Sequence, residues 1–210
     1  MIAILDYGAG NVRNVLRALT HLGYDAEITA DHAKIAKAHA VVLPGVGAAG
    51  DTVKGLQERG LDDIVRRTIE ADRPFMGVCV GLQVLFDTTE EGGEQPCLGI
   101  LPGTVERLPE GLKVPHMGWN QVWQRGEGPY FQGLPDGSYF YFVHSYYPKP
   151  AQRALVAAET SYGIDFCCAV ARGNLLATQF HPEKSGTLGL KVYENFFKVT
   201  LGNHSRYRPA

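Results

Sequence analysis

The sequence lacks any apolar run that approaches the ~20 residues of a membrane-spanning helix. Its first six residues carry no basic flank and are too short for a signal peptide, so we expect them to form a buried strand. The chain is therefore expected to stay in the cytoplasm.

Neither sign of charge is in excess. The 20 Lys and Arg residues oppose 22 Asp and Glu residues, which leaves a net charge of −2 and no basic footprint for DNA or RNA. Apolar residues make up 45% and charged residues 20%, which is ordinary globular usage and gives no case for disorder. With no visible repeat or linker, a single domain over residues 1–210 is the simplest interpretation. The polar tail 203–210 is expected to fray.

Cysteine is scarce, and the four residues are Cys79, Cys97, Cys167 and Cys168. They form no C-x-x-C pair and no spacing typical of metal ligands. Cys167 and Cys168 are adjacent, so on a strand they would face opposite sides. We expect free and mostly buried thiols, so each cysteine must serve either packing or chemistry.

The first half alternates short apolar runs with helical patterns. Strands are predicted at 2–6, 26–28, 40–43 and 75–78, and helices at 12–22, at 51–71 with a break near Gly60, and at 80–86. Asn11 is expected to cap the first helix and Gly23 to end it. This alternation predicts an α/β fold with a mostly parallel sheet covered on both faces.

The second half has a different pattern. Strand-like segments occur at 105–108, 119–123, 139–143, 167–171 and 175–180, separated by Gly and Pro turns. We therefore expect additional antiparallel strands in this half. Residues 188–201 are predicted to form a final helix that packs through one apolar face.

One cysteine stands in a catalytic pattern. Gly77, Cys79 and Gly81 form G-x-C-x-G where a predicted strand passes into a predicted helix, the thiol counterpart of the G-x-S-x-G nucleophile elbow. The tight turn needs small flanking residues and pushes the side chain at its apex out of the sheet. The following helix presents amides that favour a thiolate, and the Val80 N–H is placed to hold an oxyanion. The alternative is a buried structural cysteine between two incidental glycines.

His181 is the candidate base. It ends the apolar run 175–180 and precedes Pro182, which holds it in an extended conformation. Because residues two apart on an extended backbone point to the same side, Glu183 is expected to orient the imidazole. Cys79, His181 and Glu183 would then act as nucleophile, base and orienter of a catalytic triad. The alternative is a histidine in a surface turn beside a solvated glutamate.

The segment 77–83, together with His181, Pro182 and Glu183, resembles the class I (triad) glutamine amidotransferases. The resemblance covers essentially the whole chain and implies a flavodoxin-like three-layer sandwich. The segments 7–11, 43–47, 115–120, 141–146 and 179–185 are similar to the glutaminase subunits of imidazole glycerol phosphate synthase, in histidine biosynthesis. Pro-His-Met-Gly-Trp-Asn at 115–120 is the most discriminating of these segments.

This resemblance implies that glutamine is hydrolysed to glutamate and ammonia through a Cys79 thioester, with no metal or cofactor. The ammonia would pass to a (β/α)8-barrel cyclase in a heterodimer, which makes imidazole glycerol phosphate and an aminoimidazole carboxamide ribotide. It assigns three groups of residues: an oxyanion hole of Val80, Gly47 and Val46; a glutamine site of Gly47, Gln83, Glu91, Ser145 and Tyr146; and a partner interface of Asn11, Asn14, Met117, Trp119 and Lys184. It also implies that the oxyanion loop rearranges before its donor points correctly.

Other interpretations stay open from the sequence. The chain could be an amidotransferase subunit of another pathway or a free-standing γ-glutamyl peptidase. It could also be a flavodoxin-like binding module with an inert elbow, although Gly8 and Gly10 lack the full G-x-G-x-x-G form of a phosphate loop. Met117 and Trp119 have the alternative of core packing, and Lys184 that of a solvated charge.

Overall fold

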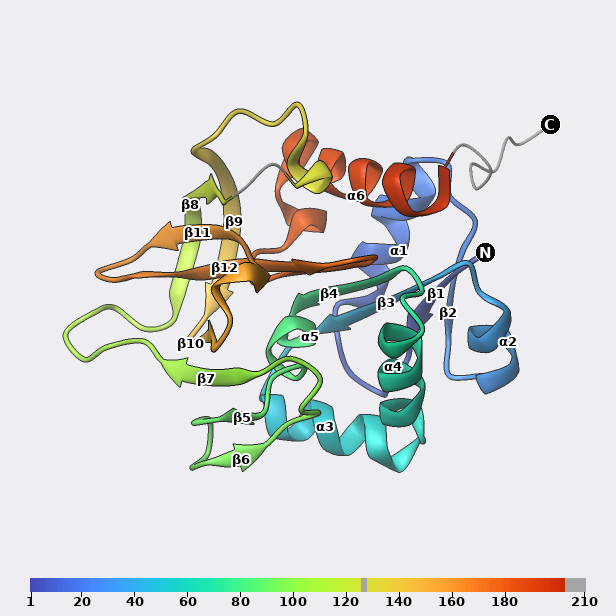
Figure 1. The fold of residues 1–210 in the computed structure, drawn as a ribbon, viewed down its shortest axis with the longest axis horizontal. Coiled ribbons are helices and arrows are strands. Elements are labelled where there is room, and N and C mark those ends of the chain that lie inside the picture. Colours follow the sequence, from blue (N-terminus) through green and yellow to red (C-terminus); the bar gives the residue numbers. More distant parts are fainter. Residues whose placement is uncertain (126–127, 203–210) are drawn as a thin grey trace.

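A computed structural model describes residues 1–125 and 128–202, and two sheets organise this part of the chain (Figure 1). The predicted tail 203–210 lies outside the described residues. The larger sheet has nine strands in the order β2-β1-β3-β4-β13-β12-β11-β8-β9. The smaller has four, in the order β10-β7-β5-β6.

The parallel half of the large sheet confirms the predicted alternation. Its strands are β1 (Ile2–Leu5), β2 (Ala26–Thr29), β3 (Ala40–Gly45) and β4 (Phe75–Cys79), joined by β13 (Leu175–Thr178), which pairs parallel with β4. The helices that connect the first four strands are α1 (Val12–His21), α2 (His32–Lys37), α3 (Ala49–Glu58) and α4 (Leu61–Glu70). Gly60 separates α3 from α4 with a φ of 62°, at the break that the sequence predicts.

Antiparallel strands of the second half extend this sheet, and the smaller sheet combines two antiparallel pairs with one parallel pair. The extension consists of β12 (Asp165–Arg172), β11 (Val156–Ser161), β8 (His116–Gln124) and β9 (Ser138–His144). The small sheet contains β5 (Thr88–Thr89), β6 (Gln95–Pro96), β7 (Gly103–Arg107) and β10 (Tyr146–Pro150). The remaining elements are α5 (Val80–Gln83), the 3₁₀ helices η1 (Pro129–Phe131), η2 (Arg153–Leu155) and η3 (Pro182–Lys184), and α6 (Gly186–Leu201).

Helices cover both faces of the parallel strands, giving the three layers visible in Figure 1. On one face α2, α3 and α4 pack into a core with Leu5, Leu43 and Phe75. On the other face α1 and α6 pack into a second core with Ile4 and Met76. Because strand side chains alternate between faces, adjacent apolar residues serve different cores. Cys167 and Cys168 lie in opposite cores, as predicted, and all four cysteines are free.

Two local predictions need correction. The helix expected at 80–86 is a single turn, α5, and Asn11 stands at the start of α1 without making the predicted side-chain capping bond. Within the described residues, no helix has the length and apolar character required to cross a bilayer.

Candidate active site

Cys79 lies at the apex of a strained turn between β4 and α5. Its φ of 56° and ψ of −113° are unusual for a residue that carries a side chain, and such strain typically costs about 1–3 kcal/mol. The flanking glycines are sterically required. A Cβ on Gly81 would lie 2.0 Å from the Leu43 carbonyl oxygen, and one on Gly77 would lie 2.6 Å from the Gly81 carbonyl oxygen. The G-x-C-x-G pattern therefore forms the predicted elbow.

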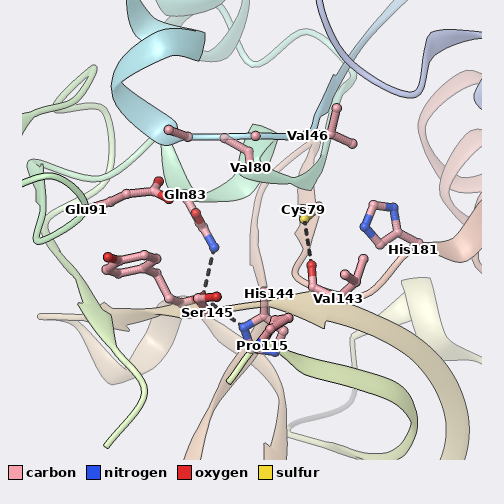
Figure 2. Close-up of a pocket in the computed structure, with 13 residues that line it drawn as sticks. Val46, Cys79, Val80, Gln83, Glu91, Pro115, Val143, His144, Ser145 and His181 are labelled. Carbon is pink, nitrogen blue, oxygen red and sulfur yellow. Dashed lines mark hydrogen bonds between the residues drawn. The ribbon is translucent and has the colours of Figure 1, made fainter. Parts of the chain in front are cut away.

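A pocket of about 500 Å³ opens at this turn (Figure 2). Both Cys79 and His181 line it, as does every residue predicted for the oxyanion hole or for glutamine binding. The complete lining is Val46, Gly47, Ala48, Cys79, Val80, Gln83, Glu91, Pro115, Val143, His144, Ser145, Tyr146 and His181. Its volume suits a small metabolite.

His181 and Glu183 form the predicted contact. Nδ1 of His181 lies 2.8 Å from Oε1 of Glu183, and both side chains are buried. Because a carboxylate oxygen only accepts, Nδ1 carries a proton and Nε2 is the nitrogen left for the sulfur. His181 is extended, as predicted, but Pro182 begins η3. The contact is therefore made through a 3₁₀ turn, and the predicted reason, a continuous extended backbone, is wrong.

The charge environment keeps a proton on His181. Burial by itself lowers the pKa of this imidazole, but hydrogen bonding and negative charge from Cys79 and Glu183 act more strongly in the opposite direction. Together they raise the pKa of His181 to about 9. The imidazole is therefore a cation at neutral pH, beside the sulfur that it would serve.

The Glu183→Gln variant is expected to lower the titration midpoint of His181 by about one to two pH units. The amide keeps the size of the side chain but removes the negative charge that favours the protonated imidazole. Nitrogen-15 NMR of the imidazole against pH measures this change. Glu110→Gln, which neutralises an exposed carboxylate, is the control and should leave the midpoint in place. An unmoved midpoint in Glu183→Gln would show that Glu183 does not charge His181.

Two further side chains surround Glu183. Nδ2 of Asn11 donates a 2.9 Å hydrogen bond to Oε1, the same oxygen that binds His181. Asn11 was predicted for the partner interface, and the structure places it against the candidate triad. Burial, with the Glu183 carboxylate nearby, raises the pKa of Tyr193 well above its ordinary value.

The other end of the pocket carries two polar side chains from different segments. Glu91 accepts a 2.7 Å hydrogen bond from the backbone N–H of Ala49, at the start of α3. Nε2 of Gln83 donates to the carbonyl oxygen of Tyr146 at 2.9 Å and to Oε1 of Gln179, also at 2.9 Å. Both N–H groups of Gln83 are thus in use, which leaves its oxygen as the atom for a ligand.

Sequence reasoning gave no role to Gln179 or to a buried histidine pair. Nε2 of Gln179 lies 3.6 Å from the sulfur of Cys79. Nδ1 of His116 lies 2.9 Å from Nε2 of His144, and burial lowers the pKa of His116 to about 4 and that of His144 to about 3. Gln179 carried a usable signal, because it stands two residues before His181 in the segment 175–180 that the sequence predicts as a strand.

The residues predicted to face a partner lie mostly at the surface. The side chains of Met117 and Trp119 are 62% and 55% exposed, which excludes the alternative of core packing. The exposed Lys184 has its ammonium 5.7 Å from the centre of the Tyr141 ring. Asn14 is half-buried on α1.

Among residues 1–125 and 128–202, no group of three or more His, Cys, Asp or Glu side chains is arranged to hold a metal ion.

Comparison with known proteins gives the family. The model of the family "Glutamine amidotransferase class-I" matches residues 3–200. A solved structure described as a glutamine amidotransferase superposes with a TM-score of 0.74 at 25% identity, covering 95% of this chain and 98% of that one. PurLQS from Thermotoga maritima gives the same TM-score at 17% identity, which supports the fold alone. The chain belongs to the class I glutamine amidotransferases.

Curated relatives identify one family within this class. Imidazole glycerol phosphate synthase subunit HisH of Dehalococcoides mccartyi (strain CBDB1) is 57% identical over 203 residues, covering 97% of this chain and 99% of the relative. The subunit of the same name from Moorella thermoacetica is 51% identical, covering 93% of each chain. Within the class I amidotransferases, the chain belongs to the HisH family.

Proposed function

We propose that this chain is the glutaminase subunit of an imidazole glycerol phosphate synthase, with Cys79, His181 and Glu183 as its catalytic triad. The observation that carries the proposal is one pocket in which the strained Cys79 turn meets a His181 that is buried and bonded to a carboxylate. The HisH relatives at 57% and 51% identity support the choice of reaction. The family match over residues 3–200 supports a single amidotransferase domain over residues 1–210.

The reaction begins at the sulfur. The Cys79 thiolate attacks the side-chain amide carbon of glutamine and forms a tetrahedral adduct. The imidazolium of His181 protonates the amide nitrogen, the carbon–nitrogen bond breaks, and ammonia leaves behind a γ-glutamyl thioester. Water then attacks the thioester as His181 takes its proton, which releases glutamate and returns the thiolate. Glu183 holds the imidazole in the tautomer that both steps need.

Backbone amides would hold the oxyanion of the adduct. Val80 begins α5, and the first N–H groups of a helix have no partner within the helix. Val46 and Gly47 line the same pocket, and Gly47 has a φ of 89°. We assign one donor to Val80 and the second to this loop, whose exposed backbone rearranges to aim its N–H.

The polar end of the pocket would bind the head of the substrate. The oxygen of Gln83 can accept from the α-ammonium group of glutamine, because both N–H groups of Gln83 are engaged. Glu91 supplies the opposite charge for the same ammonium group. Ser145 and Tyr146 also line the pocket, where their backbone would contact the substrate carboxylate.

The released ammonia needs a protected route to a second site. In bulk water near neutral pH it would be protonated and would lose its nucleophilicity, so a sheltered route to the place of use is required. We propose a heterodimer with a (β/α)8-barrel cyclase in the cytoplasm, docked on a face formed by Asn11, Asn14, Met117, Trp119 and Lys184. The exposed apolar side chains of Met117 and Trp119 support an interface there.

Glutamate release, measured with and without the cyclase and its nucleotide substrate, tests this function. We expect release to rise in the complex, and a thiol-reactive glutamine analogue to label the peptide that contains Cys79. Strong release by the isolated chain on γ-glutamyl peptides would instead indicate a peptidase. No labelling of Cys79 would indicate a binding module with an inert elbow.

The Trp119→Ala variant is expected to weaken cyclase binding at least about tenfold, because a large exposed aromatic is the kind of residue that anchors an interface. Its free energy of unfolding should change by less than about 1 kcal/mol, since the ring is 55% exposed. Titration calorimetry with purified cyclase measures the affinity. Trp123→Ala, which removes a 40% exposed ring farther along β8, is the matched control and should bind as the wild type does. Equal losses of cyclase affinity in both variants would show that the docking face does not lie at Trp119.

A further inference from the structure

Gln179 lies beside the nucleophile because of the pairing between two strands. In the parallel register of β13 and β4, Ala177 stands opposite Gly77 and Thr178 opposite Val78. The next residue along β13, Gln179, therefore comes level with Cys79. Its side chain is fully buried, and its backbone N–H donates a 2.8 Å hydrogen bond to the Cys168 carbonyl oxygen.

A chain of hydrogen bonds leads from Gln179 to a fixed backbone carbonyl group. Oε1 of Gln179 lies 2.9 Å from Nε2 of Gln83, and that nitrogen lies 2.9 Å from the Tyr146 carbonyl oxygen. Nδ1 of His144 also lies 2.9 Å from the same carbonyl oxygen. At the other end, Nε2 of Gln179 lies 3.6 Å from the sulfur of Cys79.

The direction of this chain is determined by its acceptor end. A carbonyl oxygen only accepts, so Gln83 must turn its NH₂ group to Tyr146 and, with its second proton, to Gln179. Gln179 must then present its oxygen to Gln83 and its NH₂ group to the sulfur. The reverse orientation would bring two oxygen atoms together with no proton between them. The group that faces Cys79 is therefore a hydrogen-bond donor.

We propose that Gln179 is a catalytic residue whose side-chain N–H donates a hydrogen bond to the Cys79 thiolate. The inference rests on the proposed glutaminase function and adds a residue to that site. The sulfur has another polar neighbour, the Val143 carbonyl oxygen at 3.9 Å, to which a thiol can donate but which repels a thiolate. Gln179 has the opposite effect, because its N–H group favours the thiolate over the thiol. It stabilises the sulfur before attack and again when the thioester breaks.

Alkylation of Cys79 by iodoacetamide at a series of pH values tests the hydrogen bond, with the modified peptide followed by mass spectrometry. Gln179→Met keeps the length of the side chain and removes the donor. The pH of half-maximal alkylation should rise by about one unit, and the rate at neutral pH should fall about tenfold, because a hydrogen bond to a charged group favours the charged form. At high pH the two rates should converge. With the cyclase present, kcat should fall about tenfold while KM for glutamine changes little.

Thr178→Val is the matched control. It removes a buried 3.0 Å hydrogen bond, from the hydroxyl to the Phe180 carbonyl oxygen, on the same strand and away from the sulfur. Its alkylation profile should coincide with that of the wild type even if the variant loses stability. The titratable side chains that line the pocket with Cys79 are His181, His144, Glu91 and Tyr146, and both variants retain all of them.

The outcomes separate the two claims. An unchanged alkylation profile in a folded Gln179→Met chain would overturn the role of Gln179. A wild-type chain that alkylates normally but releases no glutamate with the cyclase would overturn the proposed function. If Gln179→Met does not fold, the wild type supplies the test, because the side-chain N–H resonances of Gln179 should shift when Cys79 ionises. Resonances that stay in place across that range would overturn the role.

Discussion

The His181→Asn variant is expected to release glutamate at least about four orders of magnitude more slowly than the wild type, with KM changed by less than about fivefold. In the tetrahedral adduct, a thiolate leaves far more readily than an unprotonated amide nitrogen. Without the Nε2 proton of His181 the adduct therefore returns to glutamine instead of losing ammonia. Asparagine can still place an N–H near Oε1 of Glu183, so the loss would report the missing acid and base. Steady-state kinetics in the cyclase complex measure it.

The control for this prediction is a double-mutant cycle with Cys79→Ala. Residues that act as one catalytic unit lose their effect together, so the double variant should be no slower than the slower single variant. Additive losses would mean that Cys79 and His181 act in separate steps. More than about 1% of wild-type activity in a folded His181→Asn chain would point to another base in the pocket.

The parts of the site that sequence predicts are those encoded in short segments. The Cys79 elbow requires only five consecutive residues, and a Cβ at either flanking glycine would meet backbone oxygen at 2.6 Å or less. The contact between His181 and Glu183 spans two residues, so it was predictable even though a 3₁₀ turn makes it. Both features are carried by short segments, which is why the pattern was sufficient even though the carbonyl oxygen that excludes a side chain at Gly81 belongs to Leu43 on another strand.

The features that the sequence did not predict depend on partners far along the chain. The helix expected at 80–86 ends after one turn because the amides of Leu85 and Phe86 bond to carbonyl oxygens three residues back instead of four. The carbonyl groups that would carry the helix further accept from outside it: Val84 accepts from Leu98, and Leu85 accepts from both Ile100 and Leu101. The side chain of Asn11 does not cap α1 but donates a hydrogen bond to Glu183, 172 residues away. The contact between Gln179 and Cys79 needs the register of β13 on β4.

The Gly81→Ala variant is expected to lose more than about 4 kcal/mol of unfolding free energy, or to fail to accumulate as a folded chain. The added Cβ would lie 2.0 Å from the Leu43 carbonyl oxygen, which belongs to the central strand β3. Backbone in the middle of a sheet cannot move aside without breaking its ladder, so overpacking here exceeds the usual 1–3 kcal/mol. Urea unfolding followed by circular dichroism measures the difference.

Gly50→Ala is the matched control. The same methyl group would meet nothing within 4 Å in the first turn of α3, so stability should stay equal or rise by up to about 1 kcal/mol. From the other side of the contact, a Cβ on Gly45 would lie 2.6 Å from the Gly81 nitrogen. Gly45→Ala should therefore be as damaging as Gly81→Ala. Glycine at both positions lets the Cys79 turn sit directly on the strand that leads into Val46 and Gly47. A Gly81→Ala chain as stable as Gly50→Ala would show that the turn does not need this close approach.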